Sequence, residues 1–443
     1  MPTRRRLLAW GAAAAAAGPG LAACGETAGA ARMTRASRRR PGQRAHLVMW
    51  TWVPLRKAVA LWNRKHPDIQ VTVQMVPANT SGGYQKMHSA VQAGNPPDLA
   101  QIEYWALPEF MLSGALTDIS AYGADTLKDR YVDWQWQQGV FAGATYAMPQ
   151  ASGPMGFFYR KDLYEKWDVE VPRTWDEFRA AARKIKKRSG GSYISAFPPA
   201  NAQWFSSFPW QAGARWIRTE GDTWIVDLTG EESRRVADFW NALLRDGLVL
   251  PTQDSQSAFF KALQTGRLAS WPGAQWQDAL IRGNAPGTTG RWRVTELPQW
   301  ERGAHASSNW GGSATAIMQG TRYPREALEF AHWLNSAPES IDLLVAAGYG
   351  WPAAKLELAG SALGRPDPFF GGQRYNDVFQ RSDRHVDTSW RFSPTTTQSY
   401  ARIQDNFGRV LAGHGGLRDA LRDAERSFVD DLRAKGLKAR AAS

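Results

Sequence analysis

Apolar and polar positions follow one another along the chain in a way that predicts strands and helices in turn from residue 46 onward. β-prone runs lie at 46–52 and 98–102, and apolar and polar residues alternate strictly over 69–75, as in a half-buried strand. Between these runs, apolar residues recur at helical spacing over 54–66 and 84–91, and proline or glycine follows each stripe. This order predicts parallel βαβ units.

The same patterns return in the second half of the chain. Thr174 begins a capping box ahead of a helix, and apolar stripes over 236–244, 400–411 and 417–432 predict further amphipathic helices. No repeat of solenoid length occurs, and no stretch after Arg44 is apolar enough to span a membrane. The remaining chain is long enough for two α/β lobes, each with its own core.

One segment, "YAMPQASGPMGFFYRKDLYEK", predicts a passage between two such lobes. It brings Pro149, Gly153, Pro154 and Gly156 together in eight residues, directly before a β-prone run. A buried strand normally excludes proline and is weakened by glycine. The segment therefore reads as a hinge.

The N-terminus has the layout of an export signal over residues 1–23, with a basic start and a short apolar run. Arg4 and Arg5 resemble a twin-arginine signal. The sequence Leu-Ala-Ala-Cys that ends at Cys24 resembles the lipobox of bacterial lipoproteins, in which the cysteine is acylated after cleavage. The alternative is that Cys24 is an ordinary free thiol. It is the only cysteine in the chain, which excludes an internal disulfide.

The net charge of +13 is concentrated before the predicted lobes, since residues 1–44 hold nine Arg and one Glu. A basic chain often binds nucleic acid. Here most of the excess lies in the signal and in residues 24–44, which lack apolar periodicity and read as a flexible tether over anionic lipid headgroups. The charge therefore gives little support to a nucleic-acid partner.

Six blocks in sequence order resemble the carbohydrate-binding family (family 1) of extracellular solute-binding proteins of bacterial ABC importers. The resemblance covers nearly the whole mature chain. Each block alone is weak evidence for the family, but six blocks in the family's order are strong evidence. The blocks are "GNPPDLAQIEYWALPEFMLSGALTDIS", "TYAMPQASGPMGFFYRKDLYEK" with "VPRTWDEFRAAARKI", "FFKALQTGRLASWPGAQW", "NWGGSATAI", "YGWPAA" and "SPTTTQSYARIQDNFGRVLAG".

The resemblance implies an α/β, two-lobed periplasmic-binding-protein-like fold of type II with three crossings between lobes. Gln150, Gly153 and Gly311 are the expected hinge residues, because glycine permits the backbone rotation that closure needs. The expected crossings lie near 150–153, 308–312 and 335–340. The expected lobes are 45–151 plus 310–337 for the N-terminal lobe, and 152–309 plus 338–443 for the C-terminal lobe.

The function implied by the resemblance is capture of a mono- or oligosaccharide by hinge closure and its delivery to the transmembrane subunits of an ABC permease. The expected protein is a monomer on the extracellular face of the cell membrane, held there by lipid on Cys24. No cofactor, metal or catalytic residue is expected.

Aromatic content agrees with a sugar ligand, because the chain holds 22 Trp. A flat indole covers the apolar face of a sugar ring. Trp276, Trp310 and Trp351 lie beside Gly or Pro in predicted loops, where clefts form, and Trp276 matches the position of a sugar-stacking Trp in the family. The alternative is core packing, which helical spacing favours for Trp62, Trp175 and Trp240.

For the further candidates, contact with the substrate and a purely structural role are about equally supported by the sequence. Glu103 and Trp105 follow the run 98–102, and cleft residues lie at the carboxyl ends of strands in α/β sheets. Tyr400 lies in a predicted helix where relatives often present an aromatic residue. Trp52 and Trp210 complete the set.

Three positions depart from the family pattern. Close relatives usually carry Asp where this chain has Ala151, which removes a plausible acceptor for sugar hydroxyls. Arg160 replaces a common Asn, and Ser270 a common Met. These changes bear on the identity of the sugar more than on the fold.

Two other functions remain open from the sequence. A glycoside-active enzyme would need two carboxyls on opposite sides of the scissile bond, and Glu103 with Asp98 or Asp118 could supply them. No other catalytic motif occurs: the seven His are scattered, and there is no G-x-S-x-G and no phosphate-binding loop. The second alternative is an interaction protein that kept the binding fold.

Overall fold

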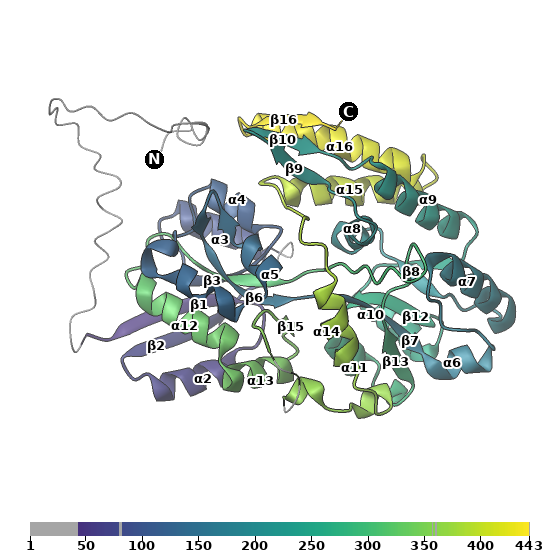
Figure 1. Ribbon diagram of the computed structural model, residues 1–443, viewed down its shortest axis with the longest axis horizontal. Helices are drawn as coiled ribbons and strands as arrows, with labels where there is room; N and C mark the ends of the chain where they lie inside the picture. Colours follow the sequence, from purple (N-terminus) through teal and green to yellow (C-terminus); the bar gives the residue numbers. More distant parts are fainter. Residues whose placement is uncertain (1–42, 79–81, 357, 359–360, 443) are drawn as a thin grey trace.

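The computed structural model describes residues 43–78, 82–356, 358 and 361–442 and folds them into two α/β lobes joined by crossing segments (Figure 1). We call the lobe with the first strand the N-terminal lobe and the other the C-terminal lobe. In Figure 1 the purple strands of the N-terminal lobe lie at the left, and the yellow C-terminal helices lie at the top right. The predicted signal, tether and Cys24 lie outside the described residues.

A mixed sheet forms the centre of the N-terminal lobe, with strand order β15-β6-β14-β3-β1-β2. β1 pairs in parallel with β2 and β3, which confirms the predicted βαβ units, whereas β14 runs antiparallel to β3 and β6. The strands are β1 (Ala45–Thr51), β2 (Ile69–Met75), β3 (Leu99–Glu103), β6 (Ala147–Ser152), β14 (Ser313–Ile317) and β15 (Trp351–Pro352).

Helices cover both faces of this sheet because side chains of each strand alternate between faces. Leu47 and Met49 pack in one cluster with α2 and α12, and Trp50 and Ala100 pack in another with α3 and α4. The elements around the sheet are α2 (Arg56–Lys65), α3 (Gly83–Gln92), α4 (Leu107–Leu112), η3 (Ser120–Tyr122), η4 (Ala124–Arg130), α5 (Asp133–Gln138), β4 (Val140–Phe141), β5 (Ala144–Thr145), α12 (Pro324–Ser336) and α13 (Pro338–Ala346).

The C-terminal lobe is built around the sheet β12-β7-β13, with β11 and β8 paired beside it. Its strands are β7 (Met155–Arg160), β8 (Ser195–Phe197), β11 (Val249–Pro251), β12 (Ser270–Ala274) and β13 (Trp292–Thr295). Its helices are α6 (Lys161–Lys166), α7 (Trp175–Ser189), α8 (Ala202–Gln211), α9 (Glu231–Arg245), α10 (Ser257–Thr265), α11 (Gln277–Asn284), η5 (Pro286–Thr288), η6 (Ala362–Gly364), η7 (Pro368–Phe370), α14 (Asn376–Arg384) and α15 (Thr396–Leu411).

Tryptophan fills much of the core. Trp175 and Trp240, which helical spacing assigns to the core, are fully buried in the C-terminal lobe, and Trp62 is fully buried in the N-terminal lobe. Trp204 stacks on Trp271 with 5.3 Å between ring centroids. The core-packing interpretation of the helix-face tryptophans is therefore correct.

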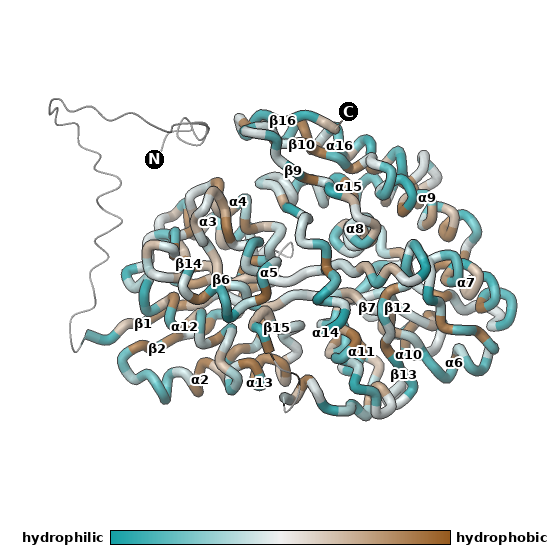
Figure 2. The backbone as a smooth tube through the Cα atoms, viewed as in Figure 1, coloured by the Kyte–Doolittle hydropathy of each residue, from teal (hydrophilic) through white to brown (hydrophobic). Residues whose placement is uncertain are grey.

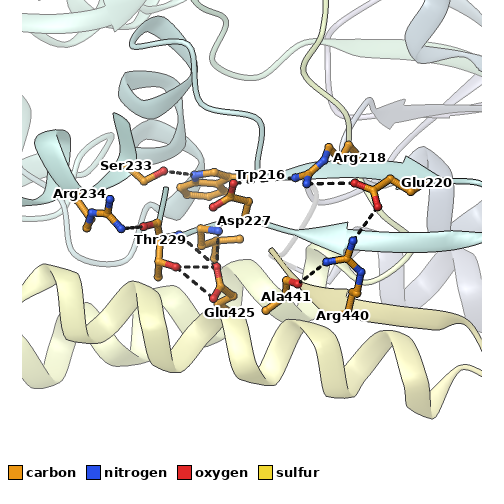
Figure 3. Close-up of polar contacts among 11 residues, drawn as sticks. Trp216, Arg218, Glu220, Asp227, Thr229, Ser233, Arg234, Glu425, Arg440 and Ala441 are labelled. Carbon is orange, nitrogen blue, oxygen red and sulfur yellow. Dashed lines mark hydrogen bonds and ion pairs between the residues drawn. The ribbon is translucent and has the colours of Figure 1, made fainter. Parts of the chain in front are cut away.

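The end of the chain adds a further layer to the C-terminal lobe. The carboxylate of Glu425 accepts hydrogen bonds from the backbone N–H groups of Leu228 and Thr229 at 2.7 and 3.2 Å (Figure 3). It thus fastens α16 (Leu417–Ala434) to the loop that precedes α9. Beside it, β16 (Lys438–Ala441) joins β10 (Thr223–Val226) and β9 (Ile217–Glu220) in one sheet.

The outer helices keep the amphipathic character that predicts them. Brown and teal segments follow one another along α9 and α16 (Figure 2), and the buried residues of these helices include Val236 and Trp240 of α9 and Leu421 and Phe428 of α16. Within the part of the chain that the structure describes, no helix has the length and apolarity needed to cross a membrane.

The chain passes between the lobes after β6, after β13 and after β15. The third passage differs from the expected position at 335–340. α13 packs on α2, and Trp351 pairs with Ser152 of β6, so the chain stays in the N-terminal lobe through Ala354, which bridges to Tyr131. The position at 335–340, which the family resemblance implies, is therefore too early, and a strand as short as β15 leaves no periodic signal that could correct it.

Candidate ligand-binding cleft

The first two crossing segments lie side by side and are joined through Asn309. The Gly153 N–H donates to Asn309 Oδ1 at 2.7 Å, and Asn309 Nδ2 donates to the Gly311 carbonyl at 2.7 Å. The Trp310 N–H donates to the Gly153 carbonyl at 2.9 Å. Asn309 was not among the sequence candidates, although it lies within the block "NWGGSATAI". The two segments therefore behave as one connected strap between the lobes.

Two of the expected hinge residues are glycines, and each position requires glycine for a different physical reason. A Cβ on Gly153 would lie 2.0 Å from the Trp310 carbonyl oxygen, so glycine is needed there for close approach. Gly311 has φ +83°, a left-handed conformation that favours glycine. The third expected hinge residue, Gln150, is buried and accepts a hydrogen bond from Thr315 Oγ1 at 3.0 Å.

Trp276 lies against this strap, at the end of β12. Its indole N–H donates to the Trp310 carbonyl at 2.9 Å, and its ring centroid lies 4.6 Å from that of Trp310. Trp310 is 2% exposed and Trp351, in β15, is 6% exposed. The structure thus brings the three favoured tryptophans to the junction of the lobes, where they also pack against the backbone.

The other candidates gather on the facing surfaces of the two lobes. On the N-terminal lobe, the Tyr84 ring lies 6.4 Å from Trp52 and 5.6 Å from Trp105. The Tyr84 hydroxyl donates to Glu103 Oε2 at 3.2 Å and accepts from the Glu103 N–H at 2.8 Å. Burial, and then the Glu103 carboxylate, raise the pKa of Tyr84. We call Trp52, Tyr84, Glu103 and Trp105 the aromatic wall.

Tyr400 of α15 approaches the aromatic wall from the C-terminal lobe. Its ring lies 6.0 Å from Trp105, and its hydroxyl lies 3.1 Å from Ser206 Oγ of α8. Burial raises the pKa of Tyr400, and the charge of Glu103 adds to the rise. The carboxylate of the N-terminal lobe and the phenol of the C-terminal lobe are therefore buried close to one another where the lobes meet.

A second aromatic contact joins the lobes one helical turn along α8. Trp134 of α5 meets Trp210 edge to face at 6.2 Å, and Trp210 stacks on Trp390 at 5.0 Å. Trp210 was a sequence candidate, but Trp134 and Trp390 were missed. Trp134 reads as an ordinary helix residue in "DWQWQQ", so no sequence signal separates it from core tryptophans.

Polar side chains also connect the lobes near α4. Glu109 of the N-terminal lobe accepts hydrogen bonds from Thr397 Oγ1 at 2.7 Å and from Gln398 Nε2 at 3.3 Å. Both donors belong to the first turn of α15. The lobes of this structure are thus in direct contact across the cleft.

Several buried donors at this junction have no hydrogen-bond partner among the described residues, among them Trp105 Nε1, Gln150 Nε2 and Trp390 Nε1. Buried N–H groups are seldom left unpaired in folded proteins. Hydroxyl groups of a bound ligand are suitable acceptors for such donors. The chemistry of the cleft is therefore aromatic faces with hydrogen-bond donors and one carboxylate.

Asp98 and Asp118, the carboxyls proposed to act with Glu103 in a glycosidase, take part in other hydrogen bonds. Asp98 precedes β3, whereas Glu103 is its last residue, so about 16 Å of strand separates them. Asp98 accepts hydrogen bonds from the Val48 N–H at 2.9 Å and from Thr321 Oγ1 at 2.5 Å. Asp118 accepts from the Ser120 N–H in a local turn.

Of the three positions that depart from the family pattern, Arg160 and Ser270 form hydrogen bonds inside the C-terminal lobe, and Ala151 forms none with its side chain. Arg160 is buried and forms two hydrogen bonds to Asp162, at 2.8 and 2.7 Å. Ser270 donates to the Ile194 carbonyl at 2.6 Å inside the C-terminal lobe. Ala151 is 4% exposed in β6, beside the strap, and offers no polar group.

Comparisons with known proteins agree with this geometry. A family model described as bacterial extracellular solute-binding protein matches residues 53–340. The lactose-binding protein of Rhizobium radiobacter is 24% identical over 348 residues, which cover 74% of this chain and 79% of that protein.

Solved structures resemble the whole described fold. The galacto-N-biose-/lacto-N-biose I-binding protein of the ABC transporter from Bifidobacterium longum, in complex with lacto-N-biose, is 28% identical with a TM-score of 0.82. The ABC transporter associated binding protein from B. animalis subsp. lactis Bl-04, in complex with β-1,6-galactobiose, is 28% identical with a TM-score of 0.79. Each match covers 90% of this chain and 100% of the other. Because the family model matches more than half of its length, this chain belongs to the bacterial extracellular solute-binding protein family.

Proposed function

We propose that this protein captures a sugar between its two lobes and delivers it to an ABC importer. The observation that carries the proposal is the aromatic wall facing Tyr400 across the lobe junction, with unpartnered indole N–H groups beside it. Rings of aromatic residues cover the apolar faces of a sugar, and the N–H groups and Glu103 bind its hydroxyls. Trp276, Trp310 and Trp351 would border the same space at the strap.

Three of the relatives support one class of sugar. The three proteins compared above are named for, or hold, lactose, lacto-N-biose and β-1,6-galactobiose. These disaccharides share a β-linked galactosyl unit. We therefore expect a disaccharide or short oligosaccharide that contains such a unit, with the carboxylate missing at Ala151 replaced by other acceptors in the cleft.

Binding without turnover tests this function. A domain that begins at Ala45 should melt at a higher temperature with lactose, lacto-N-biose or galactobiose, because a ligand of the folded state stabilises it by mass action. It should release no monosaccharide from the sugar that binds. A panel without any shift would contradict sugar binding, and release of monosaccharide that Glu103→Gln abolishes would identify an enzyme instead.

A glycoside-active enzyme is the second candidate, and the geometry gives it less support. Asp98 and Asp118 are held in hydrogen bonds away from Glu103. An inverting or retaining hydrolase needs its two carboxyls about 5–10 Å apart across the bond. The family and the compared relatives are binding proteins.

The site of action is outside the cytoplasm, as for the rest of this extracellular family. We propose further that acyl chains on Cys24 hold the protein on the membrane as a monomer, next to its permease. The lipobox-like sequence supports this, as does the basic tether that follows it.

Cys24→Ala is expected to release the protein into the medium or to leave it unprocessed, because the acyl chains are the only strong anchor proposed. Cell fractionation and the mass of the N-terminal peptide would measure this. A fully processed Cys24→Ala protein that stays in the membrane fraction would contradict the lipid anchor.

A further inference from the structure

A carboxyl of the C-terminal lobe is buried against the N-terminal lobe. Asp383, in the last turn of α14, is 9% exposed. Apart from the neighbouring Arg384, the side chains near enough to influence its carboxyl belong to the other lobe: Trp134 and Gln135 of α5, and Trp351 of β15. Asp383 is therefore a contact between lobes and not part of either core alone.

α14 is seated so that this carboxyl points away from its own lobe. One turn before Asp383, Phe379 packs on Phe158 of β7 with 5.6 Å between centroids. A Cβ on Gly156 would lie 2.7 Å from the Phe379 ring, so a glycine in the hinge segment allows the close fit. Phe379 thus anchors the helix to the C-terminal lobe, and Asp383 reaches across.

The receiving side is an ordered group of polar side chains. Gln135 is fully buried, donates to Ser152 Oγ at 3.0 Å and accepts from the Tyr104 hydroxyl at 3.4 Å. Trp134 Nε1 lies near enough to the Asp383 carboxyl to lower its pKa, yet no hydrogen bond of ordinary geometry joins the two groups within the described part of the chain. A small movement of the lobes would complete that bond.

We propose that Asp383 is a positioning residue that joins the two lobes in the closed, sugar-holding state by docking its carboxyl against Trp134, Gln135 and Trp351. The inference rests on the proposed sugar-binding function, since closure is what holds the sugar. When the lobes open, the carboxyl returns to water. Closure therefore moves one carboxyl from water into a buried site.

This transfer makes closure depend on pH. Burial raises the pKa of Asp383 from its usual 3.8 to about 6, and the side-chain N–H groups of Trp134, Trp351 and Gln135 limit the rise. The charged and titratable groups that face it are Arg384, which lowers the pKa, and Tyr104, whose own pKa the carboxylate raises. β7 and η6 meet α14 through Phe158 and the Leu363 carbonyl, which do not titrate, and Glu296 after β13 pairs with Arg381 of α14 at 2.9 Å.

The sign follows from the two pKa values. Because the pKa is higher in the closed state than in water, closing binds a proton, and acid favours the closed state. The effect is absent well above pH 6 and complete below the ordinary pKa of 3.8. From about pH 7.5 to about pH 5 the closing equilibrium should rise roughly tenfold, and the affinity for a sugar that needs closure should rise with it.

Titration calorimetry of the domain from Ala45, with lacto-N-biose at both pH values, tests the proposal. The unmodified domain should bind about tenfold more tightly at the lower pH. Asp383→Asn keeps the shape but cannot ionise, so its affinity should not change with pH. Trp134→Phe keeps an aromatic side chain but removes the N–H, so the pH midpoint should move upward. An Asp383→Asn protein with the full pH dependence would overturn the proposal.

A matched control is Asp278, whose pKa burial also raises to about 6. The groups that act on Asp278, namely Tyr375, Ala279, Arg282 and Asp367, all belong to the C-terminal lobe. Asp278→Asn should therefore keep the pH dependence of sugar binding. Loss of that dependence in Asp278→Asn would contradict the assignment to Asp383.

Small-angle scattering without sugar separates this inference from the proposed function. The radius of gyration should fall between about pH 7.5 and about pH 5 for the unmodified domain and for Asp278→Asn, but not for Asp383→Asn. If no sugar binds while this difference appears, the sugar-binding function is wrong and the role of Asp383 in closure is supported. If the sugar binds but the radius of gyration of all three proteins changes in the same way with pH, the proposed role of Asp383 is wrong and the sugar-binding function is not affected.

Discussion

Replacing Gly153 by alanine is expected to lower the free energy of unfolding by about 1–3 kcal/mol or more and to weaken sugar binding. The added Cβ would lie 2.0 Å from the Trp310 carbonyl oxygen and 2.7 Å from Trp276 Nε1, where only backbone movement can make room. The two crossing segments would separate, and the hydrogen bonds through Asn309 would be lost. Urea unfolding and a titration with sugar would measure both effects.

Gly408 offers the matched control. It lies inside α15, and a Cβ there would meet nothing within 4 Å. Gly408→Ala should therefore stabilise the protein by about 0.5–1 kcal/mol, the usual gain for glycine to alanine in a helix. If Gly153→Ala were as stable as the parent protein, the strap would not be the tightly fitted hinge described here.

Trp105→Ala is expected to remove about 2–4 kcal/mol of sugar-binding free energy, the range of central aromatic anchors. This corresponds to roughly a thirtyfold to thousandfold loss of affinity. Trp105 is the residue of the aromatic wall that meets Tyr400 across the cleft, and its buried N–H has no partner among the described residues. The loss should appear in calorimetry, and because Trp105 is 4% exposed the melting temperature of the sugar-free protein should fall as well.

Trp333→Ala is the control for this substitution. Trp333 lies on α12 of the same lobe, where it contacts Trp62 and donates to Glu339. Its removal should leave sugar affinity unchanged. An unstable Trp105→Ala protein that still binds normally would show that Trp105 packs the lobe and does not hold the ligand.

The structure changes the expectation for Trp276. From the sequence alone, Trp276→Ala should cost affinity and little stability, because a cleft tryptophan leaves no buried cavity. Its hydrogen bond to the Trp310 carbonyl and its contact with the strap now predict a loss of stability as well. Trp105 is 4% exposed and Trp276 is half-buried, so for both substitutions the melting temperature of the sugar-free protein must be measured beside the affinity.

Sequence patterning predicts elements that rest on local periodicity. The alternating run forms β2 with its predicted bounds, and Thr174 caps α7 by accepting from the Glu177 N–H. Even there, the Glu177 carboxylate accepts from the Arg173 N–H, one residue before the partner that a capping box requires. Local signals thus fix the helix start but not each bond around it.

Features that rest on long-range pairing could not be predicted in the same way. The third crossing depends on a two-residue pairing of Trp351 with β6, which no periodicity marks. Trp134 and Trp390 become cleft candidates only when α5 and the loop after α14 meet across the lobes. The burial of the Asp383 carboxyl could not be predicted for the same reason, because its partners lie about 250 residues earlier and about 30 residues earlier in the chain.

Lobe closure on sugar is the central claim, and a distance between the lobes tests it most directly. The domain from Ala45 contains no cysteine, so Ser89→Cys on α3 and Asp405→Cys on α15 would provide two exposed positions for spin labels. In pulsed electron paramagnetic resonance, the mean distance between the labels should decrease and the distance distribution should narrow when saturating lacto-N-biose is added. Binding that leaves the distribution unchanged would contradict capture by closure.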